Sequence, residues 1–559
     1  MTALEYHEAT KHHFNRFARS AGHLDWATQP DPFRRYSGAP LLQLPRDPVA
    51  ADVPYSALFD RSAPANDASD AGVAEFFRCS LGLSAWKQFR NSRWALRVNP
   101  SSGNLHPTES YVIRDGRVLH YAPREHALEE RCDLGSEAWA KFSAGRPGFL
   151  VALTTIHWRE AWKYGERAFR YCQHDAGHAI AALRFAAALL GWRLTVLPSW
   201  SDAQLAAVLG LDRDADFTGA EREEPEIIAA VTPGEVSHWL DADPEVLVAA
   251  ARGARWSGTA NVLSRAHVEW PIIEEVALAT RRVGTGLPTR SAEPVPQSRG
   301  ADVVTSAPQG VSARAIILQR RSAVAFDARS SLPRATFLSM LARTRTGVPP
   351  WDAIDWPPHI HLLLFVHRVD GLTPGVYAYL RDPSVLGEWR AAMRTEFLWE
   401  PMNDSNDSND SNDSNDSNDS NDPNGLYLLL PFDVTWVANR VSCDQDIAAD
   451  GFFSLGMIAR LESSVRDRGD WFYRRLFWES GILGQVLYLE AEAAGGRATG
   501  IGCFYDDPVH EAAGLTGTEW QSLYHFSMGV PVEDDRLTTE PGYEWEKVEE
   551  VEEVEKWKK

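Results

Sequence analysis

A nine-residue stretch, "NPSSGNLHP" (99–107), gathers two hydroxyls, a glycine, an amide and an imidazole between two prolines, directly before a strand-like run. Hydroxyl and amide groups in a tight turn can donate hydrogen bonds to a bound ligand, and glycine lets the backbone come close to it. A helix cap is the alternative, but a cap needs only one hydroxyl. We therefore expect a ligand to be covered by Pro100, Ser101, Ser102 and Asn104.

Two sequence motifs in the second half of the chain have residues that suit a flat, anionic ligand. "RRSAVAFD" begins with Arg320, Arg321 and Ser322. We expect it to open a helix, where guanidinium forks and backbone amides together bind a phosphate dianion. "TGIGCFYDD" contains Gly500 and Gly502, which would allow backbone amides close to the polar edge of a ring.

A lysine and a tyrosine side by side, Lys163 and Tyr164 in "KYGERAFRY", are candidates for moving a proton during catalysis. The alternative is a surface lysine next to a half-buried tyrosine. Asp175 and His178 follow on the same predicted helix, and we expect them to act as packing and capping groups.

Composition and charge narrow the class of protein. The chain has 559 residues, of which 44% are hydrophobic, so two large globular domains are expected. The formal net charge of -21 disfavours binding to nucleic acid or to an anionic membrane. The five cysteines form no C-x-x-C pair, which predicts reduced thiols in a cytosolic protein and makes a metal site unexpected.

The apolar segments are too short or too interrupted for a membrane protein. The first residues, "MTALEYHEATKHHFNRF", contain no apolar core of signal-peptide length. The longest apolar helix expected, "AIAALRFAAALLGW", is interrupted by Arg184. We therefore expect a cytoplasmic protein.

Three segments have the composition of linkers or tails. Residues 282–314 are rich in proline, glycine and small polar residues, and they separate a first domain (1–281) from a second (315–540). Residues 403–422 are an Asn-Asp-Ser repeat, which predicts a disordered insertion in the second domain. Residues 541–559 form a charged tail.

The second half of the chain repeats the first. Residues 177–211 align without a gap with residues 481–515, and the identical pairs include Gly177 with Gly481 and Asp202 with Asp506. Each copy predicts a long apolar helix, a glycine stop, a short strand and a second helix capped by the aspartate. Upstream, both copies predict a hairpin with an Asp-Gly turn. The chain is therefore expected to hold two related domains in tandem.

The two copies differ in a complementary way. The first copy has "PSSGN" where the second has "DWPPHIH". The second has the arginine pair where the first has "PYSALFD", and a glycine turn where the first has "TVLPSW". Such losses predict one composite site between the halves, whose pseudo-symmetric twin has decayed.

These motifs together resemble the nitroreductase superfamily of FMN proteins, and in particular its branch of SagB-type and thiazoline-oxidase-type dehydrogenases. The resemblance covers nearly the whole chain apart from the three segments of biased composition. It implies an α+β fold with two nitroreductase-like domains, each an antiparallel-rich sheet flanked by helices, paired within one chain as an internal pseudo-dimer.

The resemblance also implies an FMN at the interface between the domains and a role in oxidation and reduction. The residues implied to bind FMN are Pro100, Ser101, Ser102, Asn104, Arg320, Arg321, Ser322, Gly500, Ile501, Gly502 and Arg536, and the catalytic pair is Lys163 and Tyr164. Three functions remain open: a dehydrogenase acting on a modified peptide or small molecule, a nitro- or quinone-reducing enzyme that uses NAD(P)H, and a non-catalytic FMN-binding protein.

Overall fold

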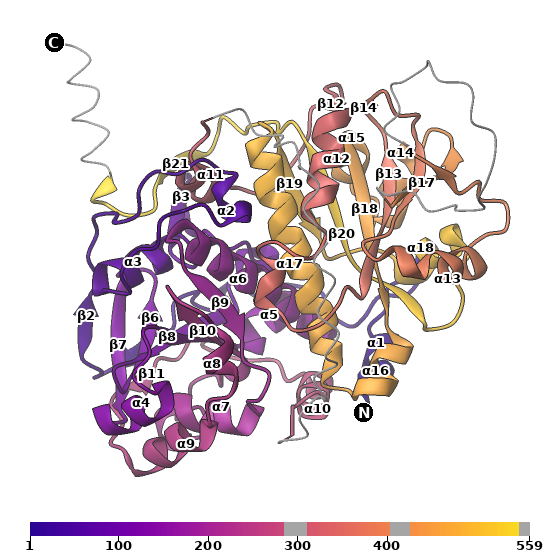
Figure 1. Ribbon diagram of the computed structural model, residues 1–559. Helices are drawn as coiled ribbons and strands as arrows, with labels where there is room; N and C mark the ends of the chain where they lie inside the picture. The colour runs from indigo at the N-terminus through magenta and orange to yellow at the C-terminus, as the bar shows by residue number, and fades with distance from the viewer. Residues whose placement is uncertain (284–309, 403–424, 547–559) are drawn as a thin grey trace.

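The computed structural model describes residues 1–283, 310–402 and 425–546 (Figure 1). The predicted insertion at 403–422 and most of the predicted linker and tail lie outside these residues. The two halves of the chain, indigo to magenta and orange to yellow in Figure 1, lie side by side.

Each half contains an antiparallel sheet of seven strands, and six strands follow the same order in both sheets, whereas the edge strands β2 and β16 come from different places in the chain order. In spatial order the first sheet is β2 (Leu41–Gln43), β7 (Ala127–Asp133), β6 (Arg117–Ala122), β5 (Thr108–Arg114), β8 (Phe149–Thr155), β10 (Glu224–Thr232) and β9 (Arg193–Val196). The second is β16 (Glu400–Pro401), β17 (Leu426–Pro431), β15 (Gly375–Tyr379), β13 (Ile360–Val366), β18 (Phe453–Arg460), β20 (Trp520–Gly529) and β19 (Arg497–Ile501). The α+β class expected from the sequence is confirmed.

Helices cover both faces of each sheet. The longer ones are α3 (Asp70–Arg78), α4 (Ser136–Ser143), α5 (His157–Tyr164), α6 (Ala168–Leu189), α7 (Asp202–Leu209), α9 (Pro244–Gly253), α10 (Pro271–Ala279), α12 (Arg334–Arg343), α17 (Phe472–Ala493) and α18 (Asp506–Ala513). The shorter ones include α1 (Ala3–Ala9), α2 (Ala57–Asp60), α11 (Ala313–Gln319), α13 (Leu386–Ala392), α14 (Thr435–Val441), α15 (Ile447–Asp450) and α16 (Glu462–Arg468).

The strands are buried on both faces because alternate side chains enter different cores. In β8, Phe149, Val151 and Leu153 face a core that also contains both long helices, α6 and α17. Leu150 and Ala152 face a separate core on the other side of the sheet. This two-residue period is the pleat of a strand between two apolar layers.

The hairpins expected at the Asp-Gly pairs are present. β5 and β6 meet at a two-residue turn in which Asp115 (φ 52°) and Gly116 (φ 80°) both have positive φ, as a type I′ turn requires. β13 and β15 also pair as an antiparallel hairpin, but their connection is longer, because Asp370 belongs to the short strand β14 (Val369–Asp370) beside β12 (Leu332–Pro333).

The two halves meet along helices α6 and α17, which cross where both have a glycine. A Cβ atom on Gly177 would lie 2.2 Å from the carbonyl oxygen of Trp478, and one on Gly481 would lie 2.2 Å from that of His174. Only glycine permits this approach of two helix backbones. The crossing therefore joins the two glycines that the sequence repeat had aligned.

Ion pairs repeat this reciprocal contact. Arg170 on α6 pairs with Asp506 (2.9 Å), and Arg474 on α17 pairs with Asp202 (2.6 Å). The two aspartates were expected to cap helices, and that prediction was wrong. Ser201 caps α7, and α18 has no side-chain cap, because both carboxylates are used across the interface between the halves.

Each half also extends a segment over the other. β21 (Thr538–Pro541) joins a three-stranded sheet with β3 (Leu83–Phe89) and β4 (Ser92–Arg97), and α1 packs against α16. Figure 1 shows the yellow β21 beside the indigo β3. Among the residues that the structure describes, no helix is both long and apolar enough to pass through a lipid bilayer.

The helix crossing yields a prediction for stability. Replacing Gly177 by valine should force α6 and α17 apart and destabilise the fold by roughly 1–3 kcal/mol or more, because the new Cβ has no room beside Trp478. Thermal unfolding should show a clear decrease in Tm. Gly253→Ala, at the open end of α9, is the control and should keep or raise Tm, because alanine favours a helix. An unchanged Tm for Gly177→Val would contradict the close crossing.

Candidate functional site

A cavity of about 440 Å³ lies between the two halves. Its volume is in the range of small-molecule sites. The first half contributes Leu96, Arg97, Asn99, Pro100, Ser101, Ser102, Gly103, Asn104, His106, Tyr164, Tyr171, Asp175 and His178. The second half contributes Arg320, Arg321, Ser322, Val324, Gln445, Tyr488, Thr499, Gly500, Ile501, Gly502, Cys503 and Tyr524. The structure thus brings together ten of the eleven residues expected at a cofactor, and one of the two expected to be catalytic.

The loop at 99–107 is held in shape by its own polar side chains. Ser101 Oγ accepts the amide of His106 (2.7 Å), and Asn104 Nδ2 donates to the carbonyl of Ala95 (2.9 Å). Gly103 and Asn104 both have a φ of 59°, a left-handed backbone that favours these two residue types. Much of the hydrogen-bonding capacity that we expected to serve a ligand therefore serves the loop.

Asp175 on α6 binds this loop through hydrogen bonds to Ser102. Its carboxylate accepts hydrogen bonds from the amide (3.0 Å) and the hydroxyl (3.0 Å) of Ser102. Burial raises the pKa of Asp175 to about 7, against the lowering effect of the bonds from Ser101 and Ser102. Burial, and then the nearby Asp175, also raise the pKa of Glu160 on α5. Asp175 was expected to be a packing group, and it is a positioning residue of the cavity wall.

Arg320 and Arg321 lie at the end of α11 and do not open a helix as expected. Arg320 follows the last residue of that helix, so this segment offers no helix N-terminus to an anion. The helix ends here because the backbone of Ser322 and Ala323 pairs with Ala498, a residue of β19. The guanidinium groups alone supply the positive charge.

Among the described residues, both guanidiniums donate only to backbone carbonyl oxygens. Arg320 bonds those of Arg97 (3.1 Å) and Val98 (3.0 Å), and its Nη1 is buried without a partner. Arg321 bonds that of Ser84 (2.8 Å), among others. Burial, and then the charge of Arg320, lower the pKa of Arg321 to about 10. An anion in the cavity would relieve this repulsion.

Tyrosines pack against the glycine segment at the end of β19. A Cβ on Gly500 would lie 2.0 Å from the hydroxyl of Tyr524, and one on Gly502 would lie 2.0 Å from Tyr171 Cε1. The amide of Gly500 donates to the Tyr488 hydroxyl (3.0 Å). The glycines were expected to make room for a ligand, and in the structure they make room for these rings.

Lys163 and Tyr164 lie at the end of α5, beside the loop. A Cβ on Gly103 would lie 2.7 Å from the Tyr164 hydroxyl and 3.1 Å from Lys163 Nζ. Tyr164 lines the cavity, whereas Lys163 lies next to Gly103 and is not part of the cavity wall. Burial, and then the nearby Glu160, raise the pKa of Tyr164 well above its ordinary value, so the phenol keeps its proton at neutral pH.

Arg536 is not part of the cavity wall. It pairs with Asp534 two residues earlier (2.7 Å), and its side chain is 75% exposed. Sequence reasoning missed Arg97, Tyr171, Tyr488, Cys503 and Tyr524, which line the cavity. Tyr171 and Cys503 belong to the quoted motifs "KYGERAFRY" and "TGIGCFYDD" but were not singled out in them, and the other three lie outside the motifs.

The pseudo-symmetric position in the other half is largely filled. The aligned residues there are Val196, Leu197 and Pro198 in place of Gly500 to Gly502, and Arg184 in place of Tyr488. Arg184 pairs with Asp352 (2.8 Å). The space left near Val196 is about 30 Å³ and is lined by Trp200 and Trp478, among others. A volume of this size holds a few water molecules and no planar cofactor.

Comparison with known proteins agrees with the fold. Residues 87–220 match the model of the Nitroreductase family. This segment includes the loop at 99–107, the Lys-Tyr pair and Asp175. At the general level the match indicates an oxidoreductase of the flavin type. The chain matches no curated protein significantly.

A solved structure shares the architecture of both halves. The crystal structure of a "putative nitroreductase" from Anabaena variabilis is 19% identical, with a TM-score of 0.65, over 95% of this chain and 99% of that one. At this identity the likeness shows the fold, and it includes both halves. A "putative nitroreductase" from Ralstonia eutropha (17% identity, 38% of this chain and 96% of that one, TM-score 0.26) matches only in part. So does a chain of the E. coli microcin synthetase McbBCD complex with truncated pro-MccB17 bound (19%, 34% and 71%, TM-score 0.25).

Asp175 yields a prediction for pH dependence. Its pKa in the folded protein, about 7, lies above the ordinary value of about 3.9. The folded protein therefore holds a proton that the unfolded chain has released, and stability decreases as pH rises between these two values. Asp175→Asn keeps an acceptor for Ser102 and removes the titration. The Tm of the variant minus the Tm of the wild type should therefore increase when both are measured at increasing pH from 4 to 7. A difference independent of pH would show that the carboxyl is not buried as described.

Proposed function

We propose that this protein is an FMN-dependent oxidoreductase with a single FMN site, built between two nitroreductase-like domains that arose by tandem duplication. The observation that carries the proposal is the cavity itself: its wall contains the buried guanidinium of Arg320 and the half-buried one of Arg321, and neither forms an ion pair with a carboxylate among the described residues. A terminal phosphate is the ligand group that best satisfies such a pair. The common order of six strands in the two sheets supports the duplication.

The remainder of the cavity wall fits a flat aromatic ring. Tyr171, Tyr488 and Tyr524 supply aromatic surface, and the Gly500–Gly502 segment presents backbone without side chains at its two ends. Pro100 to Asn104 would cover the ring from the other half. Bound FMN would supply the hydride acceptor or donor.

The residues of the chain would supply proton transfer and positioning. The Tyr164 hydroxyl, protonated at neutral pH, would give or take the proton that accompanies hydride transfer, and Lys163 Nζ would stabilise the phenolate form. Asp175 would keep the loop in the conformation that places Gly103 beside this pair.

We further propose that the enzyme is a SagB-type dehydrogenase whose substrate is a modified peptide or a small molecule. The position of Lys163 and Tyr164 beside the loop supports this, because a hydroxyl next to an amine can relay out of the cavity the proton that a substrate releases when its C–H bond is oxidised. Rapid reduction of the flavin by NADH or NADPH would instead indicate a nitro- or quinone-reducing enzyme. A flavin that no candidate substrate reduces would indicate a binding protein without turnover.

The first prediction from this proposal concerns stoichiometry. Purified protein reconstituted with FMN should bind one FMN per chain, because the twin position has little free volume. Arg321→Ala should lose most of the flavin, since a charge-assisted hydrogen bond contributes about 1.5–3 kcal/mol. Arg536→Ala, an arginine outside the cavity, is the matched control and should bind FMN like the wild type. Two flavins per chain, or retention of FMN by Arg321→Ala, would overturn the composite site.

The second prediction concerns the Lys-Tyr pair. Tyr164→Phe and Lys163→Ala should keep bound FMN but slow substrate oxidation by about 10²- to 10⁴-fold. The measurement is anaerobic mixing with candidate peptides, NADH and NADPH while the flavin absorbance is followed. Wild-type rates in both variants would make the pair structural.

A further inference from the structure

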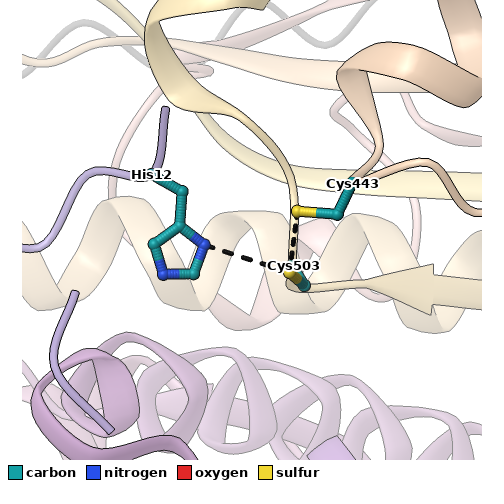
Figure 2. Close-up of side chains that lie close together, drawn as sticks. All are labelled: His12, Cys443 and Cys503. Atoms are coloured by element: carbon teal, nitrogen blue, oxygen red, sulfur yellow. Dashed lines mark hydrogen bonds between the residues drawn. The ribbon is translucent and has the colours of Figure 1, made fainter. Parts of the chain in front are cut away.

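Two cysteines from distant parts of the sequence meet at the edge of the cavity. The Sγ atoms of Cys443, which follows α14, and Cys503, which follows β19, lie 2.7 Å apart. His12, which follows α1, places its Nδ1 atom 3.9 Å from the Cys503 sulfur. Figure 2 shows the two sulfurs pointing toward each other and the imidazole facing Cys503. No motif in the sequence indicates this pair, because 59 residues separate the two cysteines.

The geometry favours a cysteine pair that can form a disulfide over a metal site. These three side chains are the group among the described residues whose ligand atoms are close enough to share an ion. Two thiolates on one tetrahedral zinc, at about 2.3 Å each, would lie about 3.8 Å apart. The observed 2.7 Å is much shorter and lies between that value and the bond length of a disulfide, about 2.05 Å.

The backbone holds the two sulfurs together. Gln445 Nε2 donates to the carbonyls of both Ser442 (2.7 Å) and Cys503 (3.0 Å), and the amide of Tyr505 donates to Val441 (2.9 Å). Cys443 and its neighbour Asp444 both have a left-handed backbone, with φ of 56° and 55°. Such a conformation is unfavourable for cysteine and persists only where the surroundings impose it.

The surrounding charges distinguish the two thiols. The hydrogen bond with Cys443 lowers the pKa of Cys503, and so do His12 and the guanidinium of Arg167. The same hydrogen bond, together with burial, raises the pKa of Cys443. Asp506 also faces the pair, but it is paired with Arg167 (2.9 Å) and Arg170. The imidazole of His12 faces Cys503 and not Cys443, so the surroundings stabilise a thiolate better on Cys503.

Both thiols are also more accessible than the other three. Cys443 and Cys503 are half-buried, and Cys503 lines the cavity, whereas Cys79, Cys132 and Cys172 are at most 2% exposed. Reactive cysteines require both thiolate character and access.

We propose that Cys443 and Cys503 form a thiol–disulfide exchange site for a small-molecule disulfide of the glutathione type. The Cys503 thiolate attacks one sulfur of the disulfide, forms a mixed disulfide and releases the other half as a thiolate, which takes a proton from water. Cys443 then attacks Cys503 Sγ, and its proton leaves with the second thiol. The net result is one Cys443–Cys503 disulfide and two reduced thiols. This site does not depend on the proposed FMN function.

The test uses the full-length protein and oxidised glutathione. After incubation, free thiols are alkylated and the peptides are mapped by mass spectrometry. The wild type should give a peptide linked through Cys443 and Cys503 that dithiothreitol reverses. Cys443→Ser should retain one glutathione on Cys503, and the matched variant Cys503→Ser should leave Cys443 unmodified. In the wild type, Cys503 should be alkylated faster than Cys443, and its rate should be half-maximal at a lower pH than the value of about 8.5 for an ordinary thiol.

Other outcomes would overturn the proposal. If both cysteines remain alkylatable after treatment with oxidised glutathione, the pair is inert. Glutathione on Cys443 in the Cys503→Ser variant would reverse the assignment of the nucleophile. One tightly bound zinc per chain, measured by elemental analysis of protein purified without chelator, would replace the dithiol with a metal site.

Discussion

The crossing of α6 and α17 at Gly177 and Gly481 is the contact on which the rest of the structure depends. With no side chain on either glycine, the two helix backbones touch, and each helix becomes fully buried between the two sheets. The ion pairs Arg170–Asp506 and Arg474–Asp202 add reciprocal contacts on either side. The arrangement is that of an isologous dimer interface placed within one chain.

This interface also determines where the cavity lies. The wall contains α6 residues from the first half and the ends of α11 and β19 from the second, so neither half could form it alone. At the related position, Arg184–Asp352 and several tryptophans occupy the space. Two halves with similar topology therefore form one open cavity and one filled position. The volume of the side chains at each position, and not the backbone fold, decides which of them is open.

Buried charge is distributed unequally over the interface. Asp506 has two arginine partners, and their charges, opposing the effect of burial, lower its pKa far below the ordinary value. The guanidinium groups of Arg320 and Arg321 donate hydrogen bonds only to carbonyl oxygens and form no ion pair among the described residues, and Asp175 has only hydrogen-bond donors from Ser101 and Ser102. Unpaired buried charge is costly, and its concentration around one cavity is characteristic of a site that binds a charged ligand.

The sequence by itself indicated the internal repeat, the hairpins and which segments surround the cavity, because local propensity and paired motifs are visible in one sequence. The α+β class was implied by the resemblance that these motifs carry. Only the tertiary structure decided that Asp202 and Asp506 form ion pairs, that Arg320 ends a helix, that Gly500 and Gly502 make room for tyrosines, and that Cys443 meets Cys503. Each of these depends on a partner hundreds of residues away or on another element, and spacing along the chain carries no information about such a partner.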